Sequence, residues 1–130
     1  VDDMAHRLVL KPDELDVLLL PNLYGDILSD LGAGTIGGLG LAPSGCYGKD
    51  FAYFESAHGT APDIAEMGII NPTASLLSAA MMLRYLNLGS AADRLETAIG
   101  EVYVAGSDLT PDQGGDAGTE RFADAVIGAL

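Results

Sequence analysis

Apolar residues recur at helical spacing in several segments of the chain and form short runs in two others. Apolar positions three and four residues apart predict helices, whereas a short apolar run bounded by turn residues predicts a strand. We therefore expect strands over residues 16–20 and 52–55, and helices over residues 4–10, 25–36, 72–86, 90–105 and 119–130. The order of these elements indicates an α/β fold whose sheet is incomplete in this segment.

The chain of 130 residues is long enough for one modest domain and is strongly acidic. It has 19 Asp and Glu against 6 Lys and Arg, which gives a net charge of −13. Such a surface repels nucleic acids and anionic membranes, so we expect neither as a partner. The hydrophobic fraction of 48% argues against intrinsic disorder. Scarce Lys and abundant Asp suggest a halophilic host, in which salt would screen the self-repulsion.

Cys46 is the only cysteine, so an intrachain disulfide is impossible and we expect a reducing, cytoplasmic location. The residue lies in the glycine-rich segment 44–48 with no evident base nearby, which disfavours a nucleophilic role. No apolar stretch has the length of a membrane span.

Asp26 and Asp30 lie four residues apart in the predicted helix 25–36. This spacing places both carboxylates on one helix face, where they can act as hard oxygen ligands for Mg²⁺ or Mn²⁺. They follow the apolar run 16–20, and open α/β sheets bind ligands at the carboxyl ends of their strands. Two acids on a solvated helix face are the alternative, because chance pairs are common in an acidic chain.

Residues 32–37 match the G-x-G-x-x-G pattern of dinucleotide-binding folds, and Glu55 follows eighteen residues later. That fingerprint requires a strand directly before its first glycine, whereas a predicted helix precedes Gly32. The small residues are better explained by close helix packing. We therefore expect no Rossmann-type site here.

The loop that begins at His58 has the composition of a nucleotide-binding segment. Gly59, Thr60, Ala61 and Pro62 combine a flexible glycine, a hydroxyl and free backbone donors with a rigid proline. Backbone N–H groups and a helix end can hold a pyrophosphate, and the imidazole offers a flat face to an adenine. Taken by itself, His58 would more often be a structural loop histidine.

Asp63 bears on which nucleotide this loop would accept. A carboxylate can accept hydrogen bonds from both hydroxyls of an adenosine ribose, but it would repel the 2′-phosphate of NADP. The predicted cofactor is therefore NAD.

Long motifs at residues 22–30, 37–44, 55–65, 71–74 and 114–119 occur in an order that resembles the isocitrate and isopropylmalate dehydrogenase family. The resemblance covers nearly the whole chain. It implies the C-terminal part of a three-layer α/β/α fold that is not a Rossmann fold. It also implies a dimerisation and metal-binding part at residues 1–36 and a nucleotide-binding part at residues 37–130. Members of the family oxidise a 2-hydroxy acid with NAD or NADP and decarboxylate it at a divalent metal.

The resemblance assigns roles to individual residues. The implied metal ligands are Asp26, Asp30 and Asp2, the last reaching into the partner's site of a homodimer. The implied cofactor-binding residues are Glu55, His58, Gly59, Thr60, Ala61, Pro62, Asp63, Ile64, Asn71 and Asp112. NADP-dependent relatives place a basic residue and often a tyrosine where this chain has Asp63 and Ile64, which agrees with NAD. From the residues by themselves, Asp2 is equally well explained as a helix cap or first-turn acid.

The catalytic Lys and Tyr of the family and its substrate-binding Arg cluster have no counterparts here, and family members are more than twice as long. Without these residues we expect that the chain does not turn over by itself. Its start at Val1 without a methionine suits a fragment, a processed chain or a partial gene model better than a complete enzyme. The expected substrate is 3-isopropylmalate, as in leucine biosynthesis, with isocitrate, homoisocitrate and tartrate open. A non-catalytic regulatory subunit or an inactive fragment is the alternative from another class.

Overall fold

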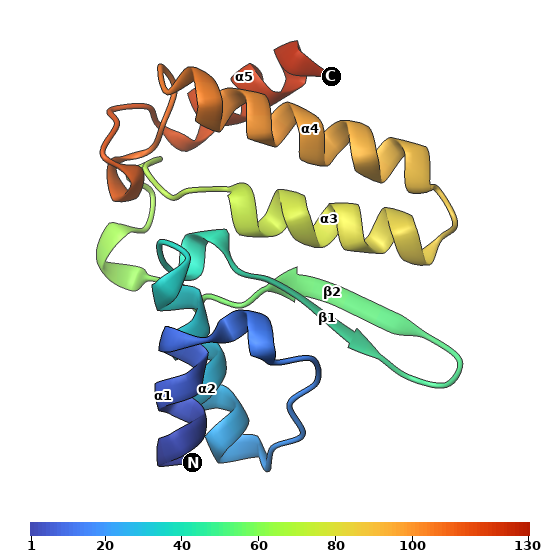
Figure 1. Ribbon diagram of the computed structural model, residues 1–130. Coiled ribbons are helices and arrows are strands. Elements are labelled where there is room, and N and C mark those ends of the chain that lie inside the picture. The colour runs from blue at the N-terminus through green and yellow to red at the C-terminus, as the bar shows by residue number, and fades with distance from the viewer. The chain divides into compact units, whose positions relative to one another are not determined.

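The computed structural model describes all 130 residues and divides them into two units, Val1–Leu39 and Gly40–Leu130 (Figure 1). The division falls three residues after the predicted boundary between residues 36 and 37. The roles that we assigned to the two parts remain predictions.

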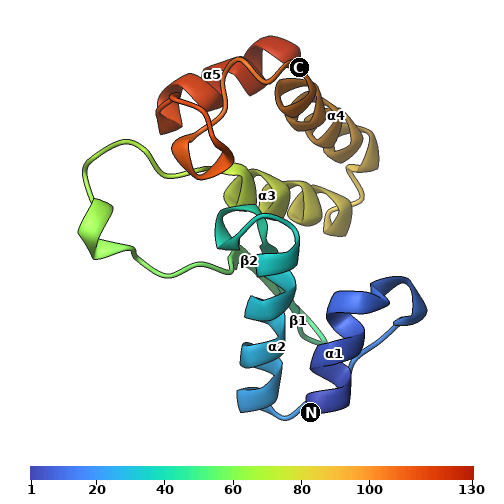
Figure 2. The same cartoon turned by 60° about the vertical axis from the view of Figure 1, so that its left-hand side comes forward.

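The first unit consists of helices α1 (Asp2–Leu10) and α2 (Asn22–Thr35), with a short 3₁₀ turn at Pro12–Glu14 between them. Leu28 and Ala33 of α2 are its buried side chains. Gly32 of α2 faces Leu8 of α1 (Figure 2), and a Cβ atom built on it would lie 3.8 Å from that side chain, an ordinary van der Waals contact. Gly32 and Gly34 lie inside α2, and no strand precedes them, which agrees with rejecting the Rossmann interpretation.

The strand predicted at residues 16–20 is absent. This segment contains no regular element, and Val17 and Leu19 are 82% and 97% exposed. The physical reason is that a strand needs a neighbour for its backbone hydrogen bonds, and Val1–Leu39 offers none. Helix α2 also begins earlier than predicted, since Gly25 N–H already donates to the carbonyl of Pro21.

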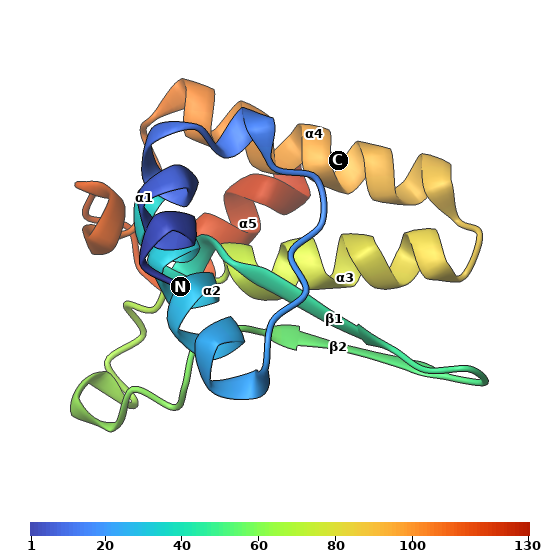
Figure 3. The ribbon, with the colours of Figure 1, turned by 60° about the horizontal axis from the view of Figure 1, so that its bottom comes forward.

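The second unit begins with a two-stranded antiparallel sheet, β1 (Pro43–Tyr47) and β2 (Ala52–Ser56). Gly45 is paired with Phe54 in the centre of its register. A Cβ at Gly45 would lie 3.1 Å from Phe54 and 3.0 Å from Met81, so a larger residue here would require these side chains to shift by a few tenths of an ångström. The predicted strand at residues 52–55 is confirmed, and its partner β1 is an addition (Figure 3).

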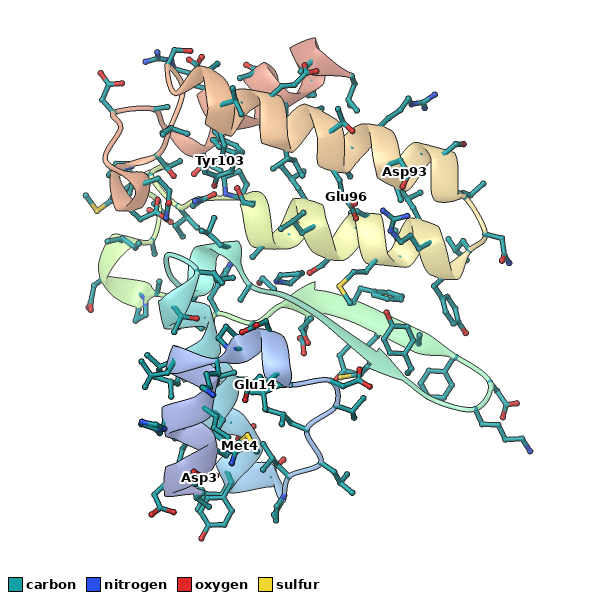
Figure 4. The ribbon with its side chains drawn as sticks, viewed as in Figure 1. Asp3, Met4, Glu14, Asp93, Glu96 and Tyr103 are labelled. Carbon is teal, nitrogen blue, oxygen red and sulfur yellow. The ribbon has the colours of Figure 1, made fainter.

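Three helices complete this unit, α3 (Thr73–Tyr85), α4 (Gly89–Ala105) and α5 (Thr119–Ala129), as the periodicity predicted. Helices α3 and α4 run antiparallel, with α3 between the hairpin and α4 (Figure 1). Phe122 and Val126 of α5 are buried against α4 in the apolar core. Arg84 of α3 pairs with Asp93 and Glu96 of α4 at 2.8 and 2.6 Å (Figure 4). The α/β class with a partial sheet is therefore confirmed.

Candidate functional site

The predicted metal ligands all lie in the first unit. Asp26 and Asp30 are one helical turn apart on α2, and both are exposed to solvent. The amide of Asn22 donates to Asp26 Oδ2 over 3.3 Å, which extends this polar face by one turn. The sequence therefore predicted a shared face that the helix provides.

Asp2 is the first residue of α1 and is also exposed. No three His, Cys, Asp or Glu side chains of the described chain come together as a metal site. The structure thus provides a pair of carboxylates in one chain, and it does not bring Asp2 to them.

The loop that follows β2 borders a pocket of about 480 Å³ in the second unit. Three predicted cofactor residues, His58, Ile64 and Asn71, line this pocket. Its wall also includes Ser75 of α3 and residues that were not predicted to bind the cofactor, namely Glu66, Gly68, Ile70, Pro72, Thr119 and Glu120. In Figure 2 the segment between β2 and α3 forms a wide loop on one side of these helices.

The loop turns sharply at Ala61, which adopts a left-handed conformation with φ of 44°. Non-glycine residues rarely occupy this region, and they concentrate at binding sites. A short 3₁₀ turn, Pro62–Ile64, follows. Ile64 points to the pocket, whereas Asp63 is exposed and is not part of the pocket wall. His58 Nδ1 lies 2.9 Å from the carbonyl oxygen of Gly59.

Asn71 is 3% exposed and is held by three hydrogen bonds. Its amide nitrogen donates to the hydroxyl of Tyr103 over 3.1 Å and to Asp112 Oδ2 over 3.0 Å. Its carbonyl oxygen accepts the backbone N–H of Thr73 over 3.0 Å. The structure therefore brings together two predicted residues, Asn71 and Asp112, that lie 41 positions apart.

Asp112 is held as a carboxylate by its surroundings. Partial burial by itself would raise its pKa, but hydrogen bonds from Thr110, Gln113 and Asn71 outweigh that effect and lower the pKa of Asp112. The strongest of these contacts is from the Thr110 hydroxyl, at 2.6 Å. Thr110 is fully buried, whereas Asp112 is exposed, so this hydrogen bond lies at the surface with its donor side covered.

Sequence reasoning missed Thr73, Tyr103 and Thr110, which support the two predicted residues. The sequence contains only weak signals for these supporting contacts. Thr73 directly follows the Asn71-Pro72 pair. Thr110 stands two residues before Asp112, a spacing at which Ser and Thr hydroxyls form local hydrogen bonds. Nothing in the pattern of α4 pairs Tyr103 with Asn71.

Glu55 lies on β2 beside a smaller pocket of about 210 Å³. This pocket is lined by Phe54, Glu55, Ser56, Ser75, Ser78, Ala79 and Met82. Ser75 lines both pockets, so the position of Glu55 and the His58 loop lie along the same stretch of α3. The fold thus arranges the predicted cofactor residues of β2, the loop and the start of α3 around one region of the second unit.

A family model described as "Isocitrate/isopropylmalate dehydrogenase" matches residues 1–126. The chain belongs to this family. Its members are decarboxylating dehydrogenases of hydroxy acids. The family predicted from the motifs is therefore confirmed.

Relatives with different names match the chain closely. An isocitrate/homoisocitrate dehydrogenase of Thermus thermophilus is 58% identical over 130 residues, which are 100% of this chain and 39% of that protein. A 3-isopropylmalate/3-methylmalate dehydrogenase of Methanocaldococcus jannaschii is 51% identical over 126 residues, which are 97% of this chain and 38% of that protein. The crystal structure of isocitrate dehydrogenase from Methylococcus capsulatus matches with a TM-score of 0.93 at 47% identity. The match covers 98% of this chain and 38% of that chain.

The chain therefore spans about two fifths of the length of these relatives, 39% of the Thermus protein.

No helix of the chain is both long enough and apolar enough for a membrane span.

Proposed function

We propose that the protein containing this chain is an NAD-dependent and metal-dependent dehydrogenase that oxidises and decarboxylates a malate-type 2-hydroxy acid. The observation that supports this most directly is the single pocket lined by His58, Ile64 and Asn71 in a member of this family. In this proposal residues 37–130 belong to a nucleotide-binding domain, and residues 1–36 belong to a domain for dimerisation and metal binding.

The pocket would hold the adenosine end of NAD. His58 would face the adenine, Gly59, Thr60, Ala61 and Pro62 would surround the nucleotide with backbone groups, and Glu55 would lie near the nicotinamide ribose. Two carboxylates line the pocket, Glu66 and Glu120, and no Lys or Arg does. This charge, together with Asp63, disfavours a 2′-phosphate and supports NAD over NADP. The NAD isocitrate dehydrogenases among the relatives support the same choice.

Asp26 and Asp30 fit a divalent cation, because they are exposed carboxylates on one face of α2 with no cationic partner. Asp2 of the partner subunit would complete the ligand set in a homodimer. A bound Mg²⁺ or Mn²⁺ would lower the pKa of the substrate hydroxyl and stabilise the negative charge that develops as CO₂ leaves. In this proposal the acid pair would hold the cation that binds the substrate, and NAD would accept the hydride from C2 of the substrate.

The substrate is one of three related acids. The overall likeness of the motifs favours 3-isopropylmalate. The names of the relatives support isocitrate and homoisocitrate as much as 3-isopropylmalate. A role as a non-catalytic subunit is the second candidate function. The presence of all three acids, Asp2, Asp26 and Asp30, argues against it. A cytoplasmic location is part of the proposal, although some relatives are mitochondrial.

The test measures NADH formation by the protein as encoded by its gene, with Mn²⁺ and each of the three hydroxy acids in turn. We expect turnover with at least one of them and its loss on chelation. Asp26→Asn and Asp30→Asn should each weaken Mn²⁺ binding by about tenfold or more, because a charged ligand is lost. Asp13→Asn, an exposed acid of the same unit, should leave it unchanged. Mn²⁺ and NAD binding without turnover on any substrate would favour the regulatory role, and no binding of either would contradict the proposal.

A further inference from the structure

Tyr103 connects the apolar core of the second unit to the wall of the pocket. Its ring packs edge-on against the fully buried ring of Phe122, with a centroid distance of 5.6 Å. Its hydroxyl lies 3.1 Å from the amide nitrogen of Asn71 and 2.8 Å from the hydroxyl of Thr73. Figure 4 shows Tyr103 on α4, directed toward the segment that precedes α3. The ring is thus fixed by packing, and the hydroxyl is held at a defined place beside Asn71.

The neighbours of Asn71 determine which way its amide points. The backbone N–H of Thr73 can only donate, so the atom that faces it must be the amide oxygen. The carboxylate of Asp112 can only accept, so the atom that faces it must be the amide nitrogen. The same nitrogen then donates its second hydrogen to Tyr103. The three contacts are consistent with one orientation of the amide and with no other.

Both hydrogens of the Asn71 amide are therefore used within the protein. The side chain can donate to a nucleotide only if it gives up Tyr103 or Asp112. At 3% exposure a donor without a partner is costly, so the side chain stays in this arrangement. What the pocket receives from this arrangement is a fixed position of Asn71 between Ile70 and Pro72 in its wall.

We propose that Tyr103, acting with Thr73, is a positioning residue for the nucleotide pocket, because its hydroxyl holds the Asn71 amide and thereby fixes the Ile70-Asn71-Pro72 wall of the pocket. This inference rests on the proposed function of the pocket as an NAD site. Tyr103 does not line the pocket, so it acts only through Asn71.

Removing the Tyr103 hydroxyl should affect binding of the nucleotide and not the chemical step. Tyr103→Phe keeps the ring against Phe122 but leaves one amide hydrogen of the buried Asn71 without an acceptor. Thr73 N–H and Asp112 still orient the amide, so the expected effect is a less firmly held Asn71 in the pocket wall. We expect the KM for NAD to rise about tenfold, with kcat changed by less than about twofold. The affected groups would contact the adenosine end of NAD, which is remote from the nicotinamide that accepts the hydride.

The experiment compares four variants of the protein as encoded by its gene, by steady-state kinetics and by calorimetric titration with NAD. Tyr103→Phe and Thr73→Val remove the two hydroxyls, and Thr73→Ser restores one. Tyr85→Phe is the matched control, since Tyr85 packs against Tyr47 and Phe54 of the hairpin. We expect weakened NAD binding in the first two variants, and wild-type behaviour in Thr73→Ser and Tyr85→Phe.

The outcomes separate this inference from the proposed function. If the wild-type protein does not bind NAD, the proposed function and this inference are both overturned. If the wild type binds NAD and Tyr103→Phe binds it equally well, only this inference is overturned. If Tyr103→Phe does not fold, the comparison of Thr73→Val with Thr73→Ser decides, and equal KM values in those two overturn the positioning role. A fall in melting temperature without a change in KM would mark a purely structural role and would overturn it as well.

Discussion

The hydroxyl of Ser78, in the middle of α3, lies 2.6 Å from the carbonyl oxygen of Glu55 in β2. The same oxygen atom of Ser78 accepts the backbone N–H of Ser44 in β1 over 3.3 Å and lies 2.8 Å from the carbonyl of Ala74. Ser78 is 3% exposed, and its hydroxyl joins both strands of the hairpin to the helix at a place largely shielded from solvent. The hydrogen bond from Ser78 of α3 thereby fixes the backbone position of Glu55, a predicted cofactor residue.

Ser78→Ala should destabilise the protein. The substitution leaves the carbonyl of Glu55 and the N–H of Ser44 without their side-chain partner, and we expect a loss of about 1–3 kcal/mol in the free energy of unfolding. Urea unfolding measures this directly. Ser90→Ala, an exposed serine of α4, is the control and should stay within about 0.5 kcal/mol of wild type. Equal losses in the two variants would contradict the anchoring role.

Cofactor preference should depend on the charge at position 63. Asp63→Lys replaces a carboxylate that repels a 2′-phosphate with a cation that attracts it, so the ratio of kcat/KM for NAD over NADP should fall by about tenfold or more. Asp50→Lys changes the net charge equally in the turn between β1 and β2. If both variants shifted the ratio to the same extent, the effect would be one of overall charge, and Asp63 would have no specific role.

Stability at low pH should depend on Asp112. Its pKa is lowered in the folded protein from the ordinary value of 3.8, because the hydrogen bonds of Thr110, Gln113 and Asn71 exceed the opposing effect of burial. The folded state therefore gains stability from this group above about pH 4, and it loses that gain as the pH falls through the lowered value. Between pH 6 and pH 3, Asp112→Asn should lose less unfolding free energy than wild type does. Asp50→Asn should behave as wild type, and an identical pH dependence in all three proteins would exclude Asp112 as a contributor.

The acidic surface predicts that salt stabilises the protein. With a net charge of −13, self-repulsion opposes folding at low ionic strength, and screening removes it. The melting temperature should rise as potassium chloride increases from about 0.01 M, where the screening length is about 30 Å, to 1 M, where it is about 3 Å. A flat or falling melting temperature would contradict the halophilic interpretation.

Helices were the most predictable part of the fold, because the periodic apolar positions that define a helix lie within about a dozen consecutive residues. The segment 16–20 shows where this fails. Its apolar run is typical of a buried strand, but a strand also needs a partner, which Val1–Leu39 does not contain. Strand β1 was missed for the converse reason, since Pro43 and Gly45 have little intrinsic preference for a strand and become one by pairing with β2.

The candidate site was predictable where its residues are consecutive and unpredictable where they meet through folding. Asp26 and Asp30 share a face because they share a helix, and the loop after His58 borders a pocket that also includes Ile64 and Asn71. The contact of Asn71 with Tyr103 joins residues 32 positions apart, on the segment before α3 and on α4. No local pattern specifies such a pair, because it depends on how the two helices pack.

A crystal structure of the protein as encoded by its gene, with NAD and Mn²⁺ bound, would test the proposed function directly. We expect the adenine to lie in the pocket lined by His58, Ile64 and Asn71 and Mn²⁺ to be coordinated by Asp26 and Asp30. A nucleotide bound elsewhere while that pocket is empty, or Mn²⁺ held by other residues, would contradict it.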